Sequence, residues 1–261
     1  MKVNGQAIKD IKKYREYIKY ATKSDLKVQV SSTYLGYFWW ILDPIMQMLV
    51  YMVFVLIIFK KGEENFPIFI FSAILPWKWF ISSIMDSTNA IRSKVGLLRQ
   101  VYLPKFILPL NKVFVNTYKF LFSFIVLFVL VILFKVPITI HYLEIIIIFI
   151  INIIFICSLS LFFAHIGVYF KDIKNILVFS TKLWFYLTPC LYSLDRVPQN
   201  LRMLWWINPM TSFIESYRNV ILYGKSPYYL MLSIWLIFSL ILMHSSLKVL
   251  YKHDKNYTKV I

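Results

Sequence analysis

Two stretches decide the fold class of this chain: LFSFIVLFVLVILF at residues 121–134 and IIIIFII at residues 145–151. Neither has a polar face, whereas surface elements of a soluble domain alternate apolar with polar residues. Apolar runs of about 20 residues recur along the chain, the length at which an α-helix crosses the hydrocarbon core of a bilayer. The alternation over about ten residues that membrane β-strands show is absent. The sequence therefore predicts an all-α integral membrane protein.

The apolar runs and the polar connections between them predict one six-span transmembrane domain over residues 39–247. The spans are expected at residues 39–59, 67–88, 106–134, 142–170, 176–192 and 228–247. Residues 1–38 precede it as a cytoplasmic interface segment, and residues 248–261 follow as a cytoplasmic tail. In residues 6–21, isoleucines recur near helical spacing with lysines between them, which predicts an amphipathic helix lying on the membrane surface. Residues 24–38 form a second, more polar segment.

The net charge of +17 indicates topology rather than a nucleic-acid partner. If the N-terminus is cytoplasmic, the cytoplasmic segments hold 18 Lys and Arg, the external segments hold 7, and 4 lie within spans. Membrane proteins carry such an excess of basic residues in their cytoplasmic loops, where anionic headgroups attract them. We therefore expect both termini in the cytoplasm and no nucleic-acid partner.

The connection at residues 193–227 is too apolar for a solvated loop. The dipeptide Asn208-Pro209 divides it and favours a turn. Two short re-entrant helices at the outer side, lying at the interface or dipping into the membrane, fit this pattern. Non-helical backbone at membrane depth must be buried in protein or line a cavity. The segment therefore suggests a pathway rather than a plain bundle.

The chain lacks the residue patterns of an enzyme. No Gly-x-x-x-x-Gly-Lys-Ser/Thr phosphate loop is present, the four histidines are isolated, and the 12 acidic residues are dispersed. Cys157 and Cys190 both fall in apolar stretches and are expected to be core residues. We therefore expect no catalytic residue, no metal and no cofactor bound by this chain itself.

Four stretches in order carry a family resemblance. They are YLGYFWWILDPIMQ at 34–47; LPWKWF at 75–80, followed by 91–104 and ILP at 107–109; YFKDI at 169–173; and NP at 208–209, continuing through ESYR at 215–218 to ILY at 221–223. Around six spans they resemble the permease of the polysaccharide and teichoic-acid ABC exporters, over nearly the whole chain. The first and fourth stretches are most similar to the teichoic-acid branch.

The resemblance implies a homodimer of permeases in the bacterial cytoplasmic membrane, bound to two separate ATPase subunits that hold ATP and Mg²⁺. It implies export of a cell-wall polymer built on undecaprenyl diphosphate, with teichoic acid first and O-antigen or capsule next. It also implies a coupling helix at residues 89–103 that docks on the ATPase, supported by the turn at 171–175. The candidate coupling residues are Arg92, Lys94, Val95, Leu97, Leu98, Arg99, Val101, Tyr102, Lys171 and Asp172. The candidates for an outer re-entrant gate are Asn208, Pro209, Glu215 and Arg218, of which the last two are three residues apart and can form a local ion pair.

Charged and aromatic residues within the spans are candidates for a substrate path. Lys78 and Lys119 depart from the family pattern, and a charge at a helix centre costs about 2.5–3.5 kcal/mol. They are open to two interpretations: contact with a diphosphate or phosphodiester, or pairing with another span and snorkelling. Lys112, seven residues before Lys119, is expected to snorkel to the cytoplasmic surface. Aromatic rings pack on sugar C–H faces, but they also populate both interfaces of any membrane protein. The aromatic candidates are Tyr37, Phe38, Trp39 and Trp40 at the cytoplasmic entrance of the first span, and Trp77 in the second.

Two other functions remain open from the residues alone. A membrane-embedded transferase acting on lipid-linked glycan would need acids or a histidine in one site, and only Asp86, Glu144 and His165 lie near membrane depth. A drug or lipid ABC permease would share the architecture but carry a hydrophobic substrate.

Overall fold

The structure, a computed structural model, describes residues 2–59 and 65–257, and every regular element in them is a helix. The longer helices are α1 (Lys2–Lys13), α2 (Arg15–Ser31), α3 (Trp39–Phe59), α4 (Phe66–Thr88), α6 (Ile107–Leu133), α7 (Ile145–Tyr169), α8 (Ile173–Leu187), α10 (Pro209–Ile221) and α11 (Tyr229–Lys252). The short ones are η1 (Gly36–Phe38), η2 (Arg92–Lys94), α5 (Val95–Gln100), η3 (Ile140–Glu144), η4 (Leu194–Arg196) and α9 (Arg202–Trp206).

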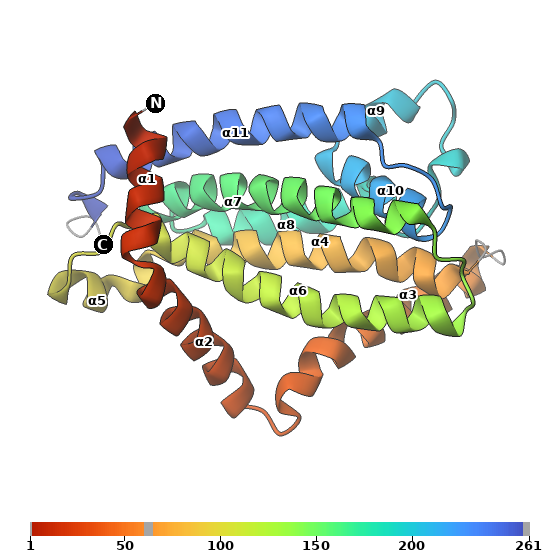
Figure 1. Cartoon of the computed structure of the whole chain (residues 1–261), viewed down its shortest axis with the longest axis horizontal. Helices are drawn as coiled ribbons and strands as arrows, with labels where there is room; N and C mark the ends of the chain where they lie inside the picture. The colour runs from red at the N-terminus through yellow and green to blue at the C-terminus, as the bar shows by residue number, and fades with distance from the viewer. Residues whose placement is uncertain (1, 60–64, 258–261) are drawn as a thin grey trace.

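The long helices run side by side along the longest axis of the molecule (Figure 1). Among the described residues, five helical segments are long and apolar enough to cross a bilayer; the first includes α3 as far as Val55, and the others contain α4, α6, α7 and α11. The predicted span at 176–192 corresponds to α8, which has 15 residues and ends at Leu187. Such a helix is about 22 Å long, shorter than the hydrocarbon core of about 30 Å. The all-helical membrane fold is thus confirmed, while the count of six spans stays a prediction.

Helix α4 lies at the centre of the bundle and packs against α3, α6, α7, α8 and α10. Its side chains are buried among aromatic rings: Trp79 stacks on Phe120 and Phe149, with ring centroids 4.5 and 5.2 Å apart. Near its end α4 approaches α7 closely, because a Cβ atom at Gly167 would lie 2.0 Å from the carbonyl oxygen of Thr88. A glycine is therefore required where the two helices meet.

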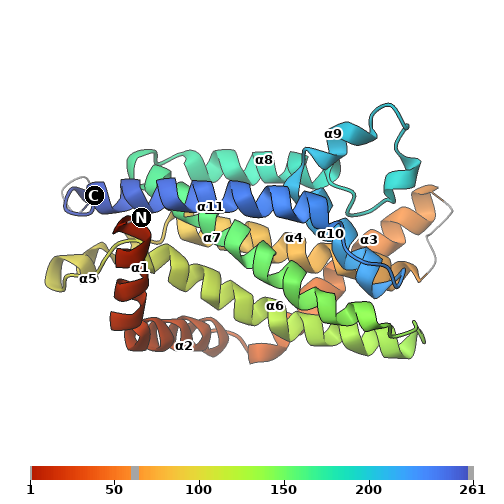
Figure 2. The same cartoon turned by 45° about the horizontal axis from the view of Figure 1, so that its top comes forward.

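The N-terminal segment differs from the single amphipathic helix predicted at 6–21. The chain breaks at Tyr14, so that α1 lies across the bundle axis and α2 slants along α6 (Figures 1 and 2). Two contacts to the bundle set these directions: Tyr251 of α11 donates to Asp10 at 2.7 Å, and Thr22 of α2 donates to Asn111 of α6 at 2.6 Å. The start of α1 and the end of α11 lie at the same end of the bundle (Figure 1).

The connection before α11 contains the two short helices predicted from the sequence, in different environments. Every residue of α10 from Met210 to Ile221 is buried, because α10 packs against α4 and α7. Helix α9 has five residues and buries none of them. An apolar segment buried in protein meets the requirement for re-entrant backbone, but the depth of α9 and α10 in a bilayer stays a prediction.

Candidate functional site

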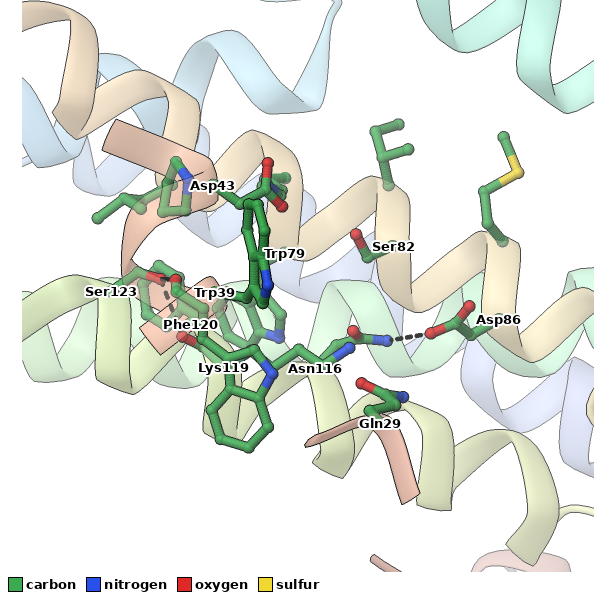
Figure 3. Close-up of a pocket in the computed structure, with 16 residues that line it drawn as sticks. Gln29, Trp39, Asp43, Trp79, Ser82, Asp86, Asn116, Lys119, Phe120 and Ser123 are labelled. Carbon is green, nitrogen blue, oxygen red and sulfur yellow. Dashed lines mark hydrogen bonds and ion pairs between the residues drawn. The ribbon is translucent and has the colours of Figure 1, made fainter. Parts of the chain in front are cut away.

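A cavity of about 560 Å³ lies between α3, α4 and α6, with Gln29 of α2 at its edge (Figure 3). It brings together four of the seven predicted substrate-path residues. These four are Trp39, Trp40, Lys78 and Lys119. Its remaining walls include polar side chains from α3, α4 and α6, so the cavity is a charged compartment inside an apolar bundle. The polar members are Asp43, Ser82, Asp86, Asn116 and Ser123.

Three of the four charged residues that line this cavity have partners. Lys78 of α4 forms an ion pair with Asp43 of α3. Asp86 accepts a hydrogen bond of 2.9 Å from the Asn116 side-chain amide (Figure 3). The pairing of Lys78 with another span, one of its two predicted interpretations, is therefore observed. Contact of Lys78 with substrate stays a prediction.

Lys119 differs from Lys78. It is half-buried, and within residues 2–59 and 65–257 no side chain or carbonyl pairs with its ammonium group. A lysine among apolar helices is stable only if it reaches water, an anion or a carbonyl. Because Lys119 lines the cavity, it is positioned to bind an anionic group there.

The aromatic wall of the cavity is formed by Trp39, Trp40, Trp79 and Phe120. The carbonyl oxygen of Trp40 accepts a hydrogen bond of 2.7 Å from Ser123, near the middle of α6. The first span therefore begins beside the middle of α6, and the cytoplasmic entrance at residues 37–40 stays a prediction. The rings that line the cavity are positioned for contact with a substrate bound in it.

Three predicted aromatic residues do not line this cavity. Trp77 is 7% exposed and packs against Phe80, Trp184 and Phe185, so it belongs to the core of the bundle, and its place in a substrate path stays a prediction. Tyr37 is outside the cavity but contacts Trp40 edge-on, at 4.9 Å between ring centroids. Phe38 is exposed.

One signal in the sequence would have located the cavity more completely. Asn116, Lys119 and Ser123 recur at helical spacing on α6, and polar residues at that spacing mark one face of a helix. Lys112 lies on the same stripe, one turn before Asn116. Its ammonium group donates to Asp25 of α2 at 2.7 Å, and its snorkelling to the cytoplasmic surface stays a prediction.

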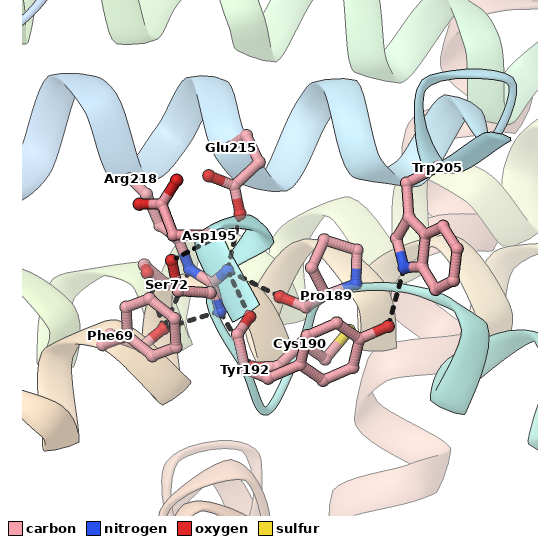
Figure 4. A network of polar contacts seen from close by, with 10 residues as sticks. Phe69, Ser72, Pro189, Cys190, Tyr192, Asp195, Trp205, Glu215 and Arg218 are labelled. Atoms are coloured by element: carbon pink, nitrogen blue, oxygen red, sulfur yellow. Dashed lines mark hydrogen bonds and ion pairs between the residues drawn. The ribbon is translucent and has the colours of Figure 1, made fainter. Parts of the chain in front are cut away.

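At the far end of the bundle, Arg218 of α10 is fully buried (Figure 4). It forms an ion pair of 2.7 Å with Glu215, which confirms the predicted local pair. Its guanidinium group also donates to the carbonyl oxygens of Phe69, Pro189, Cys190 and Tyr192, and lies 3.5 Å from the centroid of the Phe69 ring. Arg218 thus joins α10 to the start of α4 and to the irregular chain after α8.

Asn208 and Pro209 begin α10. The Asn208 side-chain oxygen accepts from the backbone of Met210 at 3.0 Å and from the indole of Trp184 at 2.9 Å. Its amide donates to Thr188 at 2.7 Å. Pro209 occupies the first helical turn, where a missing N–H is harmless. These contacts hold α10 to α8; a gating role for the four outer residues stays a prediction.

The predicted coupling helix at 89–103 is shorter than expected. It comprises η2 and the six-residue α5, which lies at the end of the bundle that carries the termini (Figure 2). The side chain of Leu98 is buried, and Arg92 donates to the carbonyl oxygen of Val168 at 2.8 Å. The ammonium group of Lys94 lies 4.0 Å from the carboxylate of Asp25. These three residues therefore anchor the segment, because their side chains face the bundle.

The remaining coupling candidates present a different surface. Val95 and Leu97 are half-buried, and the following five residues are exposed: Arg99, Val101, Tyr102, Lys171 and Asp172. Past α5, Lys105 is 4% exposed and forms an ion pair of 3.2 Å with Asp254. Arg99, Val101 and Tyr102 thus belong to a segment that is attached to the bundle on both sides of them. Contact of the exposed residues with a partner stays a prediction.

No group of three or more His, Cys, Asp or Glu in the described part of the chain is placed to hold a metal ion. The acids and histidine that a transferase would need are separated. Asp86 is in the cavity, Glu144 lies 3.2 Å from His141, and His165 lies 2.7 Å from the hydroxyl of Tyr257. Burial raises the pKa of Tyr257, so its phenol is neutral. The cavity therefore contains only one of the three residues that a transferase would need, Asp86.

The bundle of apolar helices and its charged cavity define this chain as a multi-pass integral membrane permease. Permeases of this class lie in the bacterial cytoplasmic membrane. The family model of the ABC-2 type transporter matches residues 16–222, and the chain belongs to this family.

Curated relatives agree with this membership over most of their length. The chain is 30% identical to the O-antigen export system permease protein RfbA of Myxococcus xanthus, over 84% of this chain and 85% of that protein. It is 26% identical to the protein of the same name from Klebsiella pneumoniae, over 79% and 80%. It is 22% identical to the polysialic acid transport protein KpsM of Escherichia coli, over 77% and 79%. The resemblance to polysaccharide exporter permeases is thus confirmed.

Proposed function

We propose that this chain is the membrane subunit of an ATP-driven exporter that moves an undecaprenyl-diphosphate-linked polymer out of the cytoplasm. The observation that carries the proposal is the cavity with the unpaired Lys119, inside the region that matches the ABC-2 family. A lipid-linked polymer presents phosphate and sugar rings together. A cation beside aromatic walls complements both of those groups.

The driving force is assigned to a partner. Two copies of a separate ABC ATPase, holding ATP and Mg²⁺, would dock on the exposed residues of α5 and on Lys171 and Asp172. A second copy of this chain would complete the path, since a diphosphate needs a polar route through the bilayer. The firm attachment of η2 and α5 to the bundle supports transmission of movement from the ATPase.

The polymer is assigned by class. The cavity contains cations and aromatic rings, which suit both a phosphodiester chain and a sugar chain. The family resemblance favours teichoic acid, whereas the relatives are named for O-antigen export and polysialic acid transport. Analysis of the polymer retained in depleted cells distinguishes these, because a backbone of repeating polyol phosphate is typical of teichoic acid.

The test is depletion in the source bacterium, with purification of the chain alongside an ABC ATPase encoded beside it. We expect lipid-linked polymer to accumulate inside the cell and to disappear from its surface, and we expect the ATPase to co-purify. Export that survives depletion, or a chain that binds no such ATPase, contradicts the proposal.

The alternatives lose support from specific contacts. The transferase would need Asp86, Glu144 and His165 in one site, and they contact three different groups of residues. A hydrophobic drug or lipid would leave the ammonium group of Lys119 without a partner in the cavity. Altered drug tolerance with normal surface polymer on depletion would favour the second alternative.

A further inference from the structure

A second cavity, of about 550 Å³, opens between α2 and α6 on the other side of α6. Phe114 and Tyr118 line it and are about one turn apart on that helix. Asn116 lies two residues from each, which is about 200° around a helix, and it lines the first cavity instead. The two cavities are therefore separated by α6.

The chemistry of this groove is divided between its floor and its rim. Ile18, Leu26 and Phe114 supply apolar floor, together with Ile11 from α1. The rim carries Arg15, Lys19 and Lys23, spaced four residues apart along one side of α2. A row of cations above an apolar trough complements a molecule with an anionic head and apolar chains.

The surroundings show what covers the groove. Tyr118, Leu121, Phe122 and Ile125 follow one another along α6 and are all exposed, so the groove continues into an apolar stripe that runs towards the outer side. In a membrane-spanning helix this stripe faces acyl chains. The groove thus opens onto the bilayer, and α2, which carries its cations, begins at the end of the molecule where α1 lies (Figure 2).

The neighbouring acids leave the rim positive. Glu16 lies 3.2 Å from Arg15 and 3.3 Å from Lys19, but all three side chains are well exposed and such pairs are weak. Asp25 is engaged by Lys112 of α6. Within the described ranges, Lys23 has no ion-pair or hydrogen-bond partner for its ammonium group.

We propose that this groove binds an anionic phospholipid of the bilayer. Arg15, Lys19 and Lys23 hold its phosphate, and its acyl chains lie along Phe114, Tyr118 and the exposed stripe of α6. The site is independent of the exported polymer, since α6 separates it from the first cavity.

The test uses the full-length chain in detergent mixed with phosphatidylglycerol and phosphatidylcholine, with retained lipid measured by native mass spectrometry. We expect wild-type protein to retain phosphatidylglycerol selectively. The triple variant Arg15→Gln/Lys19→Gln/Lys23→Gln, which lacks the three cations of the rim, is expected to retain at least about tenfold less phosphatidylglycerol. The matched control removes three exposed α1 lysines outside the groove, Lys9→Gln/Lys12→Gln/Lys13→Gln, and is expected to retain the lipid.

Equal loss in both triple variants would show unspecific attraction and overturn the site. Equal retention of the two phospholipids by wild-type protein would also overturn it, and this measurement needs no variant to fold. Displacement of phosphatidylglycerol by a small excess of undecaprenyl phosphate would assign the groove to a carrier lipid and contradict the proposal. Failure of undecaprenyl phosphate to compete supports it.

Discussion

Replacement of Arg218 by methionine should destabilise the outer end of the bundle more than most single changes. The side chain has no exposed area, and its guanidinium group satisfies Glu215 and four carbonyl oxygens. Removing one partner of a buried ion pair costs about 3–5 kcal/mol, because the other charge stays buried. We therefore expect Arg218→Met to lower the free energy of unfolding by about that amount.

A double-mutant cycle separates the buried charge from lost packing. Once Glu215 is also replaced, in Arg218→Met/Glu215→Leu, no uncompensated carboxylate remains. The double variant should therefore be destabilised by less than the sum of the single variants, with a coupling of about 1–3 kcal/mol. The control is Arg202→Met, because Arg202 makes its contacts in the outer loop and is partly exposed, and the expected loss there is below about 1 kcal/mol.

The assay is thermal or denaturant unfolding in detergent, followed with a thiol-reactive fluorophore. Cys190 is fully buried, and its carbonyl oxygen accepts from Arg218 at 2.8 Å, so with Cys157 replaced by serine the Cys190 thiol reports opening of this region. Wild-type stability of Arg218→Met, or strict additivity of the two single changes, would refute the reasoning.

Two further outcomes follow from the structure. Gly167→Ala should lower the free energy of unfolding by about 1–3 kcal/mol, because the new Cβ atom would lie 2.0 Å from the Thr88 carbonyl oxygen. Gly96→Ala is the control and should not lower it, because no atom lies within 4 Å of that Cβ position. Equal stabilities of the two variants in the same thiol assay would contradict this expectation. Arg99→Glu, on the exposed side of α5, should reduce permease-stimulated ATPase activity several-fold, while the free energy of unfolding stays that of the wild type. The control Lys12→Glu on α1 should leave that activity unchanged. Wild-type permease-stimulated ATPase activity in Arg99→Glu would show that α5 is not part of the interface with the ATPase.

The sequence predicts the long helices well for a physical reason. A span must be long and apolar enough for the bilayer, so the predicted spans at 39–59 and 67–88 match α3 and α4 closely. The break at Tyr14 was not predicted, since neither glycine nor proline marks it. Contacts with α6 and α11 place α1 and α2 in different directions, and those contacts are remote in sequence.

The site is only partly predictable because a uniformly apolar helix does not indicate which face meets a cavity. Trp77 and Trp79 are two residues apart, so they point to opposite sides of α4, and only Trp79 lines the cavity. The partner of Lys78 is equally hidden, because Asp43 belongs to another span and no spacing relates them. The isolated charge of Lys119, by contrast, identified a cavity residue from the sequence alone.

The central claim is that the cavity among α3, α4 and α6 binds an anionic part of the exported molecule through Lys119. The most direct measurement compares surface polymer in depleted cells complemented with Lys119→Gln, Lys119→Arg or Lys182→Gln. Lys182 is an exposed lysine on α8 and serves as the matched control. We expect Lys119→Gln to lose at least about tenfold in export, as removal of a charged hydrogen bond of about 1.5–3 kcal/mol implies. Lys119→Arg and Lys182→Gln should export normally; wild-type export by Lys119→Gln at equal protein level would contradict the account.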